Sequence, residues 1–426
     1  MKDDTLETKL FHPEGRAHGN SFEVFGEFDT IRTMSGGNIS YMVQAQRRSD
    51  RKMYAIKFLK DGRTISESPD SVSSTAVWSL HRCFNEMAVQ TTLTHPGDRD
   101  NPIVDCYGYG YDGKDFFAVF DFIQGKNLRK VMERNHNDQL SRQLYICAAL
   151  DIFDMISDAL ILMHSYGIMH RDVKPDNIMV PGISSPGFIY PDQSLLDDSI
   201  IVKDVRLTDL GIMLIANGGL SELSRACPLD EPLFYLPKLR GKDFKIPGSP
   251  GYRPPETAFY DPIRRVDEYN LGTTLYEIAF GKRPFIQPNP SELAKANPGT
   301  FPNFPEHAGP NLRGLLRSLM NPINWKRIDI DKAGPFRDYA RIENYIDIAR
   351  SAQAIGNSDL ASDALEHARA LYSARSSNGR YGLFHPLRQL GLRLEGFENP
   401  SIGRPVYSLL AQHDLLSHHM LGPMDT

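Results

Sequence analysis

Cysteine is scarce in this sequence. The 426 residues contain four cysteines, and no two of them form a C-x-x-C pair. Disulfide scaffolds use more cysteines, and structural zinc sites place theirs in closely spaced pairs. We therefore exclude both and expect reduced thiols, in a reducing compartment such as the cytoplasm.

Long hydrophobic runs are also absent. No run of about 18 apolar residues is present, and the N-terminal MKDDTLETKL is polar and acidic, unlike a signal peptide. The most apolar stretch, residues 144–163, is interrupted by Asp151, Asp154 and Asp158. Their spacing is typical of the solvent-facing stripe of a buried helix, so we expect a helix here and no membrane span.

Neither sign of charge dominates the sequence. It has 48 Lys and Arg residues against 53 Asp and Glu residues, a formal net charge of −5. A chain without a basic field is not expected to bind nucleic acid or an anionic membrane. With 41% hydrophobic and 24% charged residues the composition is that of a globular protein, which excludes the disordered and collagen-like classes.

The spacing of the apolar residues changes along the chain. Residues 28–122 contain the short runs ISYMVQAQ, MYAIKFL and FFAVFDF, which predict strands. Beyond Gly125 the spacing is mostly helical and ends in a predicted helix pair, residues 344–354 and 360–372. A strand-rich part followed by a helix-rich part predicts two lobes with a ligand cleft between them.

The strongest chemical pattern is HRDVKPDN at residues 170–177, followed by LTDLG at residues 207–211. Phosphoryl transfer needs one carboxylate to orient the attacking hydroxyl and a lysine to neutralise charge. It also needs an asparagine and a second carboxylate to hold Mg²⁺. The first block resembles the catalytic loop of the protein kinase family.

Further motifs of that family follow in the family's order. AIK at residues 55–57 resembles its phosphate-binding strand, and Glu86 resembles the helix glutamate that pairs with the lysine. GSPGYRPPE at residues 248–256 is similar to the end of an activation segment. DEYNLG at residues 267–272 is similar to the segment with the family's buried aspartate. Arg327 is placed like the arginine that forms an ion pair with the glutamate of PPE.

The resemblance covers residues 28–332 and implies the fold class. The implied fold is α+β and two-lobed, protein kinase-like, with a small antiparallel β-rich N-lobe at about 28–122. A large, mostly helical C-lobe follows at about 123–332. Residues 1–27 are interpreted as an N-terminal leader and residues 333–426 as a helical C-terminal extension.

The resemblance also implies an activity, the ATP- and Mg²⁺-dependent transfer of a γ-phosphoryl group to protein Ser or Thr hydroxyls, including autophosphorylation. Asp172 is implied to position the nucleophile and accept its proton. Lys174, the lysine of the Ser/Thr type, is implied to stabilise the transferred group, and Ser249 to bond both residues. Lys57, held by Glu86, is implied to orient the ATP phosphates.

The family's remaining binding residues carry over in the same way. The implied metal ligands are Asn177 and Asp209. The implied nucleotide-binding residues are Met34, Gly36, Gly37, Met42, Ala55, Lys57, Phe120, Asp121, Ile123, Met179 and Thr208.

The chain departs from the family's pattern in three places. Its G-x-G-x-x-G loop aligns with SGGNIS at residues 35–40, which keeps the middle glycine and has one extra, and this predicts weaker ATP handling. Gln90 and Cys106 stand where the family stacks apolar residues, which is expected to weaken the alignment of Glu86. Residues 225–247 contain no Ser or Thr, so we hypothesise that Ser/Thr phosphorylation there does not activate the enzyme.

Alternatives stay open at this point. A pseudokinase scaffold that recruits partners through its C-terminal helices fits the altered loop but not the complete set of catalytic residues. A small-molecule kinase shares the catalytic Asp and Asn but not the GSP…PPE segment. We expect the C-terminal helices to pack on the large lobe, and a docking surface for a partner is the alternative. An effector secreted into a host cytosol is the alternative to a resident cytoplasmic protein.

Overall fold

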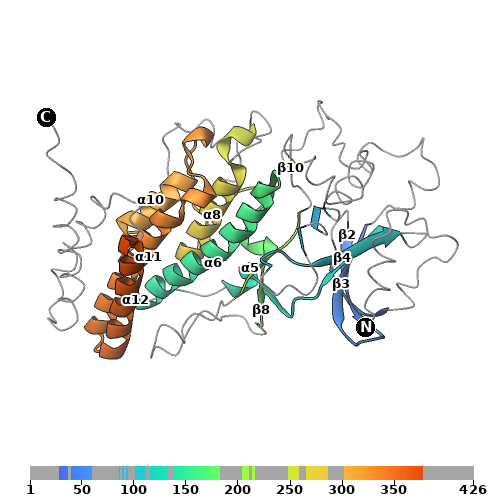
Figure 1. The fold of residues 1–426 in the computed structure, drawn as a ribbon, viewed down its shortest axis with the longest axis horizontal. Coiled ribbons are helices and arrows are strands. Elements are labelled where there is room, and N and C mark those ends of the chain that lie inside the picture. Colours follow the sequence, from blue (N-terminus) through green and yellow to red (C-terminus); the bar gives the residue numbers. More distant parts are fainter. Residues whose placement is uncertain are drawn as a thin grey trace.

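The structure is a computed structural model that describes part of the 426-residue chain (Figure 1). The described residues are 28–36, 40–59, 86, 89–90, 93–94, 101–111, 116–132, 139–182, 204–210, 214–215, 248–258, 265–285 and 302–377. Figure 1 shows a β-sheet at one end of the molecule and a group of helices at the other. The predicted two-lobed α+β architecture is confirmed.

Five antiparallel strands form the sheet of the N-terminal lobe, in the order β1-β2-β3-β5-β4. The strands are β1 (Phe28–Gly36), β2 (Ser40–Arg47), β3 (Met53–Leu59), β4 (Cys106–Tyr111) and β5 (Phe116–Asp121). The three runs predicted as strands correspond to β2, β3 and β5. Their β-branched and aromatic residues suit a pleated, half-buried surface.

Alternation along β3 separates the two faces of this sheet. One face carries a buried cluster: Phe28, Val43, Ala45, Tyr54, Ile56, Phe58, Phe117 and Val119. On the opposite face Ala55 packs in a second cluster with Phe120. Because successive side chains of a strand point to opposite faces, Lys57 lies on the face of Ala55. This face meets the second lobe, since Lys57 Nζ is 3.7 Å from Asp209 Oδ1.

Long helices build the C-terminal lobe. The described helices are α5 (Leu128–Val131), α6 (Gln139–Ser165), α8 (Val266–Phe280), α10 (Pro310–Leu319), α11 (Gly334–Ala354) and α12 (Ser358–Ser377). The stretch predicted as a buried helix, residues 144–163, lies within α6. Helix α8 is buried along nearly its whole length and packs against α6 and α10.

Short strands and turns connect the long elements. The strands are β6 (Gly125–Asn127), β7 (Ile168–Met169), β8 (Ile178–Pro181), β9 (Arg206–Leu207) and β10 (Leu214–Ile215). The 3₁₀ turns are η2 (Pro175–Asn177), η4 (Pro255–Ala258), η5 (Asn324–Lys326) and η6 (Ile330–Lys332). Strand β8 pairs with β6 and β9, between the five-stranded sheet and the long helices (Figure 1). Gly125 is required there, because a Cβ atom would lie 2.0 Å from the Val180 carbonyl oxygen.

The C-terminal helix pair packs on the large lobe. Helices α11 and α12 form a buried cluster with the start of α6, in which Leu144 and Cys147 contact residues such as Ile346 and Leu365. Helix α11 begins earlier than the predicted 344, at Gly334, with Pro335 in its first turn. In the part of the chain that the structure describes, no helix is long and apolar enough to cross a bilayer.

The acidic stripe of α6 is only partly solvent-facing, which corrects the sequence interpretation. Asp158 is exposed, but Asp151 and Asp154 face α11 and pair with its arginines. Arg341 lies 2.6 Å from Asp151 Oδ1 and 3.0 Å from Asp154 Oδ2, and Arg337 also bonds Asp154. The helical spacing of the aspartates could be recognised in the sequence. The arginines that pair with them lie 183 to 190 residues later in the chain, so the sequence pattern did not reveal the ion pairs.

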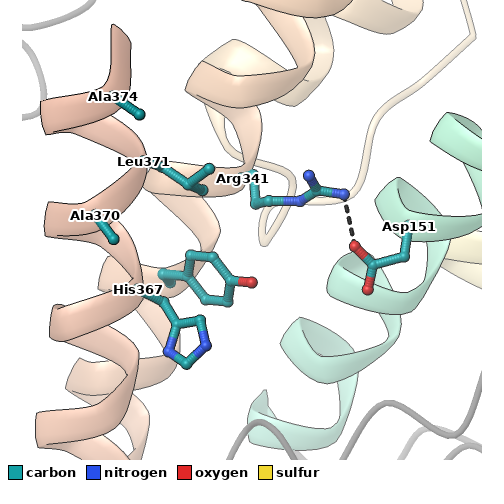
Figure 2. Close-up of a pocket in the computed structure, with 7 residues that line it drawn as sticks. Asp151, Arg341, His367, Ala370, Leu371 and Ala374 are labelled. Carbon is teal, nitrogen blue, oxygen red and sulfur yellow. Dashed lines mark hydrogen bonds and ion pairs between the residues drawn. The ribbon is translucent and has the colours of Figure 1, made fainter. Parts of the chain in front are cut away.

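A hollow of about 370 Å³ lies beside this ion-pair group, between α6, α11 and α12. Figure 2 shows Arg341 extending across it to Asp151, with His367 and Leu371 of α12 on the other side. Burial raises the pKa of Asp151 to about 6, although the attraction of Arg341 works against this increase. The ion pair therefore anchors α11 at a site where an unpaired carboxylate would be unfavourable.

The variant Arg341→Met tests this anchor, because it keeps much of the apolar side chain and removes the cation. We expect the free energy of unfolding to fall by about 2–4 kcal/mol, since two partly buried carboxylates lose a partner. Urea unfolding followed by circular dichroism measures the change.

Arg350→Met on the same helix is the matched control. Its pair with Asp347 spans 3.6 Å within one helical turn, and its loss should lower stability by under about 1 kcal/mol. Equal losses in the two variants would contradict the anchoring role of Arg341.

Candidate active site

Lys57 of β3 contacts residues of both lobes. Its Nζ donates to both carboxylate oxygens of Glu86, at 2.8 Å each. Glu86 is buried and lies in a helical segment, of which the structure describes Glu86, Val89, Gln90 and Leu93. Lys57 also lies 3.7 Å from Asp209, so one ammonium group joins the sheet, the Glu86 segment and the second lobe. The contact expected between Lys57 and Glu86 is present.

The HRDVKPDN segment forms a loop in which Asp172 is the common partner. Lys174 Nζ donates to Asp172 Oδ2 at 2.6 Å, and Asn177 Nδ2 donates to the same oxygen at 3.2 Å. A second Asn177 bond, 2.9 Å to the Asp172 carbonyl, fixes the orientation of the amide. Because the amide nitrogen is directed at Asp172, the side-chain oxygen of Asn177 is the atom left for a cation.

A strand pair brings Asp209 close to this loop. Asn177 immediately precedes β8 and Thr208 immediately follows β9, and these strands are antiparallel neighbours. Thr208 donates from both its backbone N, at 2.9 Å, and its hydroxyl, at 3.1 Å, to the Asn177 carbonyl. Asp209 follows with a half-exposed carboxylate and a φ of 64°. Left-handed backbone at a residue other than glycine is unfavourable and is common at functional sites.

The HRDVKPDN loop is fixed at its start by the buried Asp267 of α8. Its carboxylate accepts from the backbone N of His170 at 2.9 Å, the backbone N of Arg171 at 2.7 Å and the His164 ring at 2.8 Å. Burial works to raise the pKa of Asp267, but these hydrogen bonds hold the pKa below its ordinary value. An ionised Asp267 thus fixes a loop in which Arg171 has a φ of 67°.

His170 is a packed core residue. Its side chain is fully buried. Its Nδ1 accepts from the backbone N of Asp172 at 3.2 Å, and its Nε2 faces the Thr208 carbonyl at 3.1 Å. One neutral tautomer, protonated on Nε2, satisfies both contacts. His170 therefore links the loop of Asp172 to the strand of Asp209.

The segment at residues 248–258 closes one side of Asp172. Ser249 donates from its backbone N to Asp172 Oδ1 at 2.8 Å, and its hydroxyl accepts from Lys174 Nζ at 2.5 Å. Ser249 therefore contacts both residues, although its bond to Asp172 is made by the backbone and not by the hydroxyl. Further along, Arg327 forms the expected two-pronged ion pair with Glu256, with N–O distances of 2.5 and 2.6 Å.

The apolar residues predicted to bind a nucleotide base come together only in part. Ala55 and Phe120 pair across β3 and β5 and are buried, and Met42 and Ile123 pack against the same cluster. Met34 lies on β1 with an exposed side chain. Met179 is half-buried on β8. Asp121, the last residue of β5, donates from its backbone N to the Asp105 carbonyl at 3.0 Å. Gly36 ends β1.

One charged group was missed by sequence reasoning. Arg129 of α5 bonds Glu277 at 2.6 Å and Asp176 at 3.2 Å, and also contacts the Tyr252 hydroxyl. These four residues come from segments far apart in the chain, so no local spacing signals the group. Asn127, directly before α5, caps this helix by accepting from the Lys130 backbone N at 3.1 Å.

Several predictions fall outside the described residues. They concern Gly37, the leader 1–27, the Ser/Thr-free stretch 225–247 and the chain after 377. These predictions stay as they were made.

Comparison with known proteins agrees with the geometry of the site. A family model described as protein kinase domain matches residues 28–333. The chain is 27% identical over 265 residues to human serine/threonine-protein kinase 32B, covering 61% of this chain and 50% of that kinase. It is 25% identical over 322 residues to serine/threonine-protein kinase PknA of Mycobacterium tuberculosis, covering 74% of this chain and 60% of PknA.

A shorter match links the chain to a probable serine/threonine-protein kinase of Clostridium acetobutylicum. The two are 30% identical over 193 residues, which cover 45% of this chain and 23% of that protein. The chain thus spans about half or less of the length of two of these relatives, and 60% of the third.

Glu268 lies next to Asp267 on α8, and both carboxyl groups are buried. The stability of the protein should therefore depend on the pH at which Glu268 titrates. Burial, and then the charge of Asp267, raise the pKa of Glu268 from 4.5 to about 7. The native state therefore holds this proton more tightly than the unfolded chain. The resulting stabilisation is full below about pH 4.5 and is lost as the pH rises through 7.

Glu268→Gln does not titrate and should gain stability relative to wild type as the pH rises. We expect little difference near pH 4.5 and a gain of about 2–3 kcal/mol at pH 8, measured by urea unfolding at each pH. Exposed Glu306→Gln should stay within about 0.5 kcal/mol of wild type at both values. A gain for Glu268→Gln that does not change with pH would refute the account.

Proposed function

Because the chain belongs to the protein kinase family, we propose that it is a serine/threonine protein kinase. It transfers the γ-phosphoryl group of ATP to Ser or Thr hydroxyls of proteins, its own included. The observation that carries the proposal is the contact of Lys57 with both Glu86 and Asp209, together with the link from Asp172 through Asn177 and Thr208 to the strand end that bears Asp209. The two-lobed site thereby has its phosphate-binding and proton-accepting groups in one place.

Asp172 acts on the attacking hydroxyl. Its Oδ2 already accepts from Lys174 and Asn177, which hold the carboxylate in one orientation. A substrate hydroxyl that hydrogen-bonds this carboxylate is aimed at the γ-phosphorus and gives up its proton as the new P–O bond forms. Lys174 remains beside that oxygen as a cation and stabilises the negative charge on the group in transfer.

Lys57 orients the phosphates of ATP. Glu86 holds the ammonium group of Lys57 in one position. No further conformational entropy is therefore lost at Lys57 when the phosphates bind. The apolar cluster of Ala55 and Phe120 provides a surface for the base. The reaction breaks the bond between the γ-phosphorus and the β,γ-bridging oxygen and leaves ADP.

The donor set at the cleft fits Mg²⁺. Asp209 presents a half-exposed carboxylate and Asn177 an amide oxygen, both hard oxygen ligands. No group of three His, Cys, Asp or Glu side chains able to hold a metal occurs among the described residues. A site with few protein ligands suits Mg²⁺, which takes its other ligands from phosphates and water. Bound there, Mg²⁺ neutralises charge on the phosphates.

We place the enzyme in the cytoplasm, in keeping with its four cysteines, of which no two form a C-x-x-C pair. Its kinase domain comprises about residues 28–332. A docking partner, if the C-terminal helices bind one, has α12 available more than α11, because α11 is packed on α6 and α10.

Asp172→Asn tests the proposal. The variant keeps the shape of the side chain and loses the proton acceptor, so phosphoryl transfer to a mixture of model proteins should fall by at least about 100-fold. Transfer of labelled γ-phosphate, with phosphosites mapped by mass spectrometry, measures both the rate and the residue modified.

Asp158→Asn, on the exposed face of α6, is the matched control and should keep wild-type activity. Equal activity of wild type and Asp172→Asn would contradict the assigned role. Transfer only to small alcohols would instead favour a small-molecule kinase. No transfer by the wild type, with nucleotide still bound, would favour a scaffold.

A further inference from the structure

Gln90 is a polar residue in an apolar place. It lies one helical turn after Glu86, on the same face of that segment, and its side chain is 1% exposed. Its Nε2 donates to the Val104 carbonyl at 2.6 Å. Its Oε1 is buried and has no hydrogen-bond partner among the described residues. An apolar side chain would avoid that unfavourable burial, so the side-chain bond of Gln90 to Val104 needs a structural reason.

The peptide that accepts from Gln90 is tied to the second lobe. Val104 donates from its own backbone N to the Leu207 carbonyl at 3.0 Å, and Leu207 donates back to Pro102 at 2.8 Å. Leu207 ends β9, and Asp209 follows two residues later. A hydrogen-bonded connection therefore runs from the segment of Glu86, through Gln90 and Val104, to the strand that carries Asp209.

Thr94 makes a second link from the same segment. Its hydroxyl donates to the Gln90 carbonyl at 2.8 Å and accepts from the Cys106 backbone N at 3.1 Å. Cys106 begins β4, so the end of the segment is attached to the sheet that contains Lys57. Both links are buried.

These links close a loop of contacts around Lys57. Glu86 and Asp209 are its two acidic neighbours, and Gln90 connects the backbones that carry them. Apolar packing has no preferred direction, whereas a hydrogen bond fixes a distance and an angle. A bond at this point therefore sets where Glu86 stands relative to Asp209.

We propose that Gln90 is a positioning residue, which holds Glu86 in place to bind Lys57 through its hydrogen bond to the Val104 carbonyl. The proposal rests on the proposed kinase function for its catalytic consequence, but not for the contact itself. It reverses the expectation that Gln90 weakens the alignment of Glu86: this chain uses a polar link where its relatives' pattern predicts apolar stacking.

The test replaces Gln90 by methionine, which has a similar length and no donor. The direct readout is the rate at which acetic anhydride acetylates Lys57 at one fixed pH, measured by mass spectrometry of the peptide. Lys57 held by Glu86 reacts slowly because its Nζ must first leave the two carboxylate oxygens to reach the reagent. We expect Gln90→Met to raise the rate about threefold to tenfold, the range that the loss of one net hydrogen bond allows. Glu86→Gln gives the rate of Lys57 without its ion pair to Glu86.

The matched control is Gln143→Met. Gln143 is also buried, and its Oε1 accepts from the Ser351 hydroxyl at 2.7 Å, far from the cleft. This variant should acetylate like wild type even if its melting temperature falls. Gln90→Leu is prepared in parallel, so that a second apolar replacement is available if one variant does not fold.

Two outcomes overturn the proposal: a Lys57 acetylation rate that is unchanged in the folded Gln90 variants, or an equal increase in Gln143→Met. If the wild type transfers phosphate, Gln90→Met should also lower kcat about threefold to tenfold, with the KM for protein substrate unchanged. If the wild type transfers none, the proposed function fails, and the acetylation rates still decide the role of Gln90.

Discussion

The ionised carboxylate of Asp267 is the constraint on which the site depends. It is fully buried in α8 and binds the backbone of the catalytic loop at two successive residues, His170 and Arg171. Removing it would leave two buried N–H groups without a partner and release a loop that includes a left-handed residue. Asp172 follows Arg171 directly, so α8 helps to fix the position of Asp172. The same loop reaches Asp209 through His170 and Thr208.

The cleft itself is held together by charges shared between the lobes. Lys57 comes from the sheet, Glu86 from the segment beside it and Asp209 from the second lobe, and all three meet within ion-pair distance. This arrangement requires a fixed distance between the segment of Glu86 and the sheet. Gln90 and Thr94 fix it by hydrogen bonds to the backbones of Val104 and Cys106.

Much of the fold and of the site could be predicted from sequence because the informative residues are close together in the chain. The period-two runs of β2, β3 and β5 and the long helix α6 follow from local spacing, and HRDVKPDN keeps Asp172, Lys174 and Asn177 within one loop. Contacts between distant segments could not be predicted in this way. The group around Arg129 draws on four separate elements, and the arginines of α11 turn an expected solvent-facing stripe into an ion-pair anchor. From the sequence, Gln90 was expected to weaken the alignment of Glu86. Its hydrogen-bond partner is a backbone carbonyl, which a pattern of side chains cannot reveal.

The central claim is that this cleft transfers a phosphoryl group from ATP to a protein hydroxyl. The most direct measurement is the intact mass of the purified chain after incubation with ATP and Mg²⁺, with and without a chelator. The account predicts added phosphate on Ser or Thr that appears only when Mg²⁺ is present. An unchanged mass in both samples, together with bound nucleotide and no phosphate on added proteins, would contradict it.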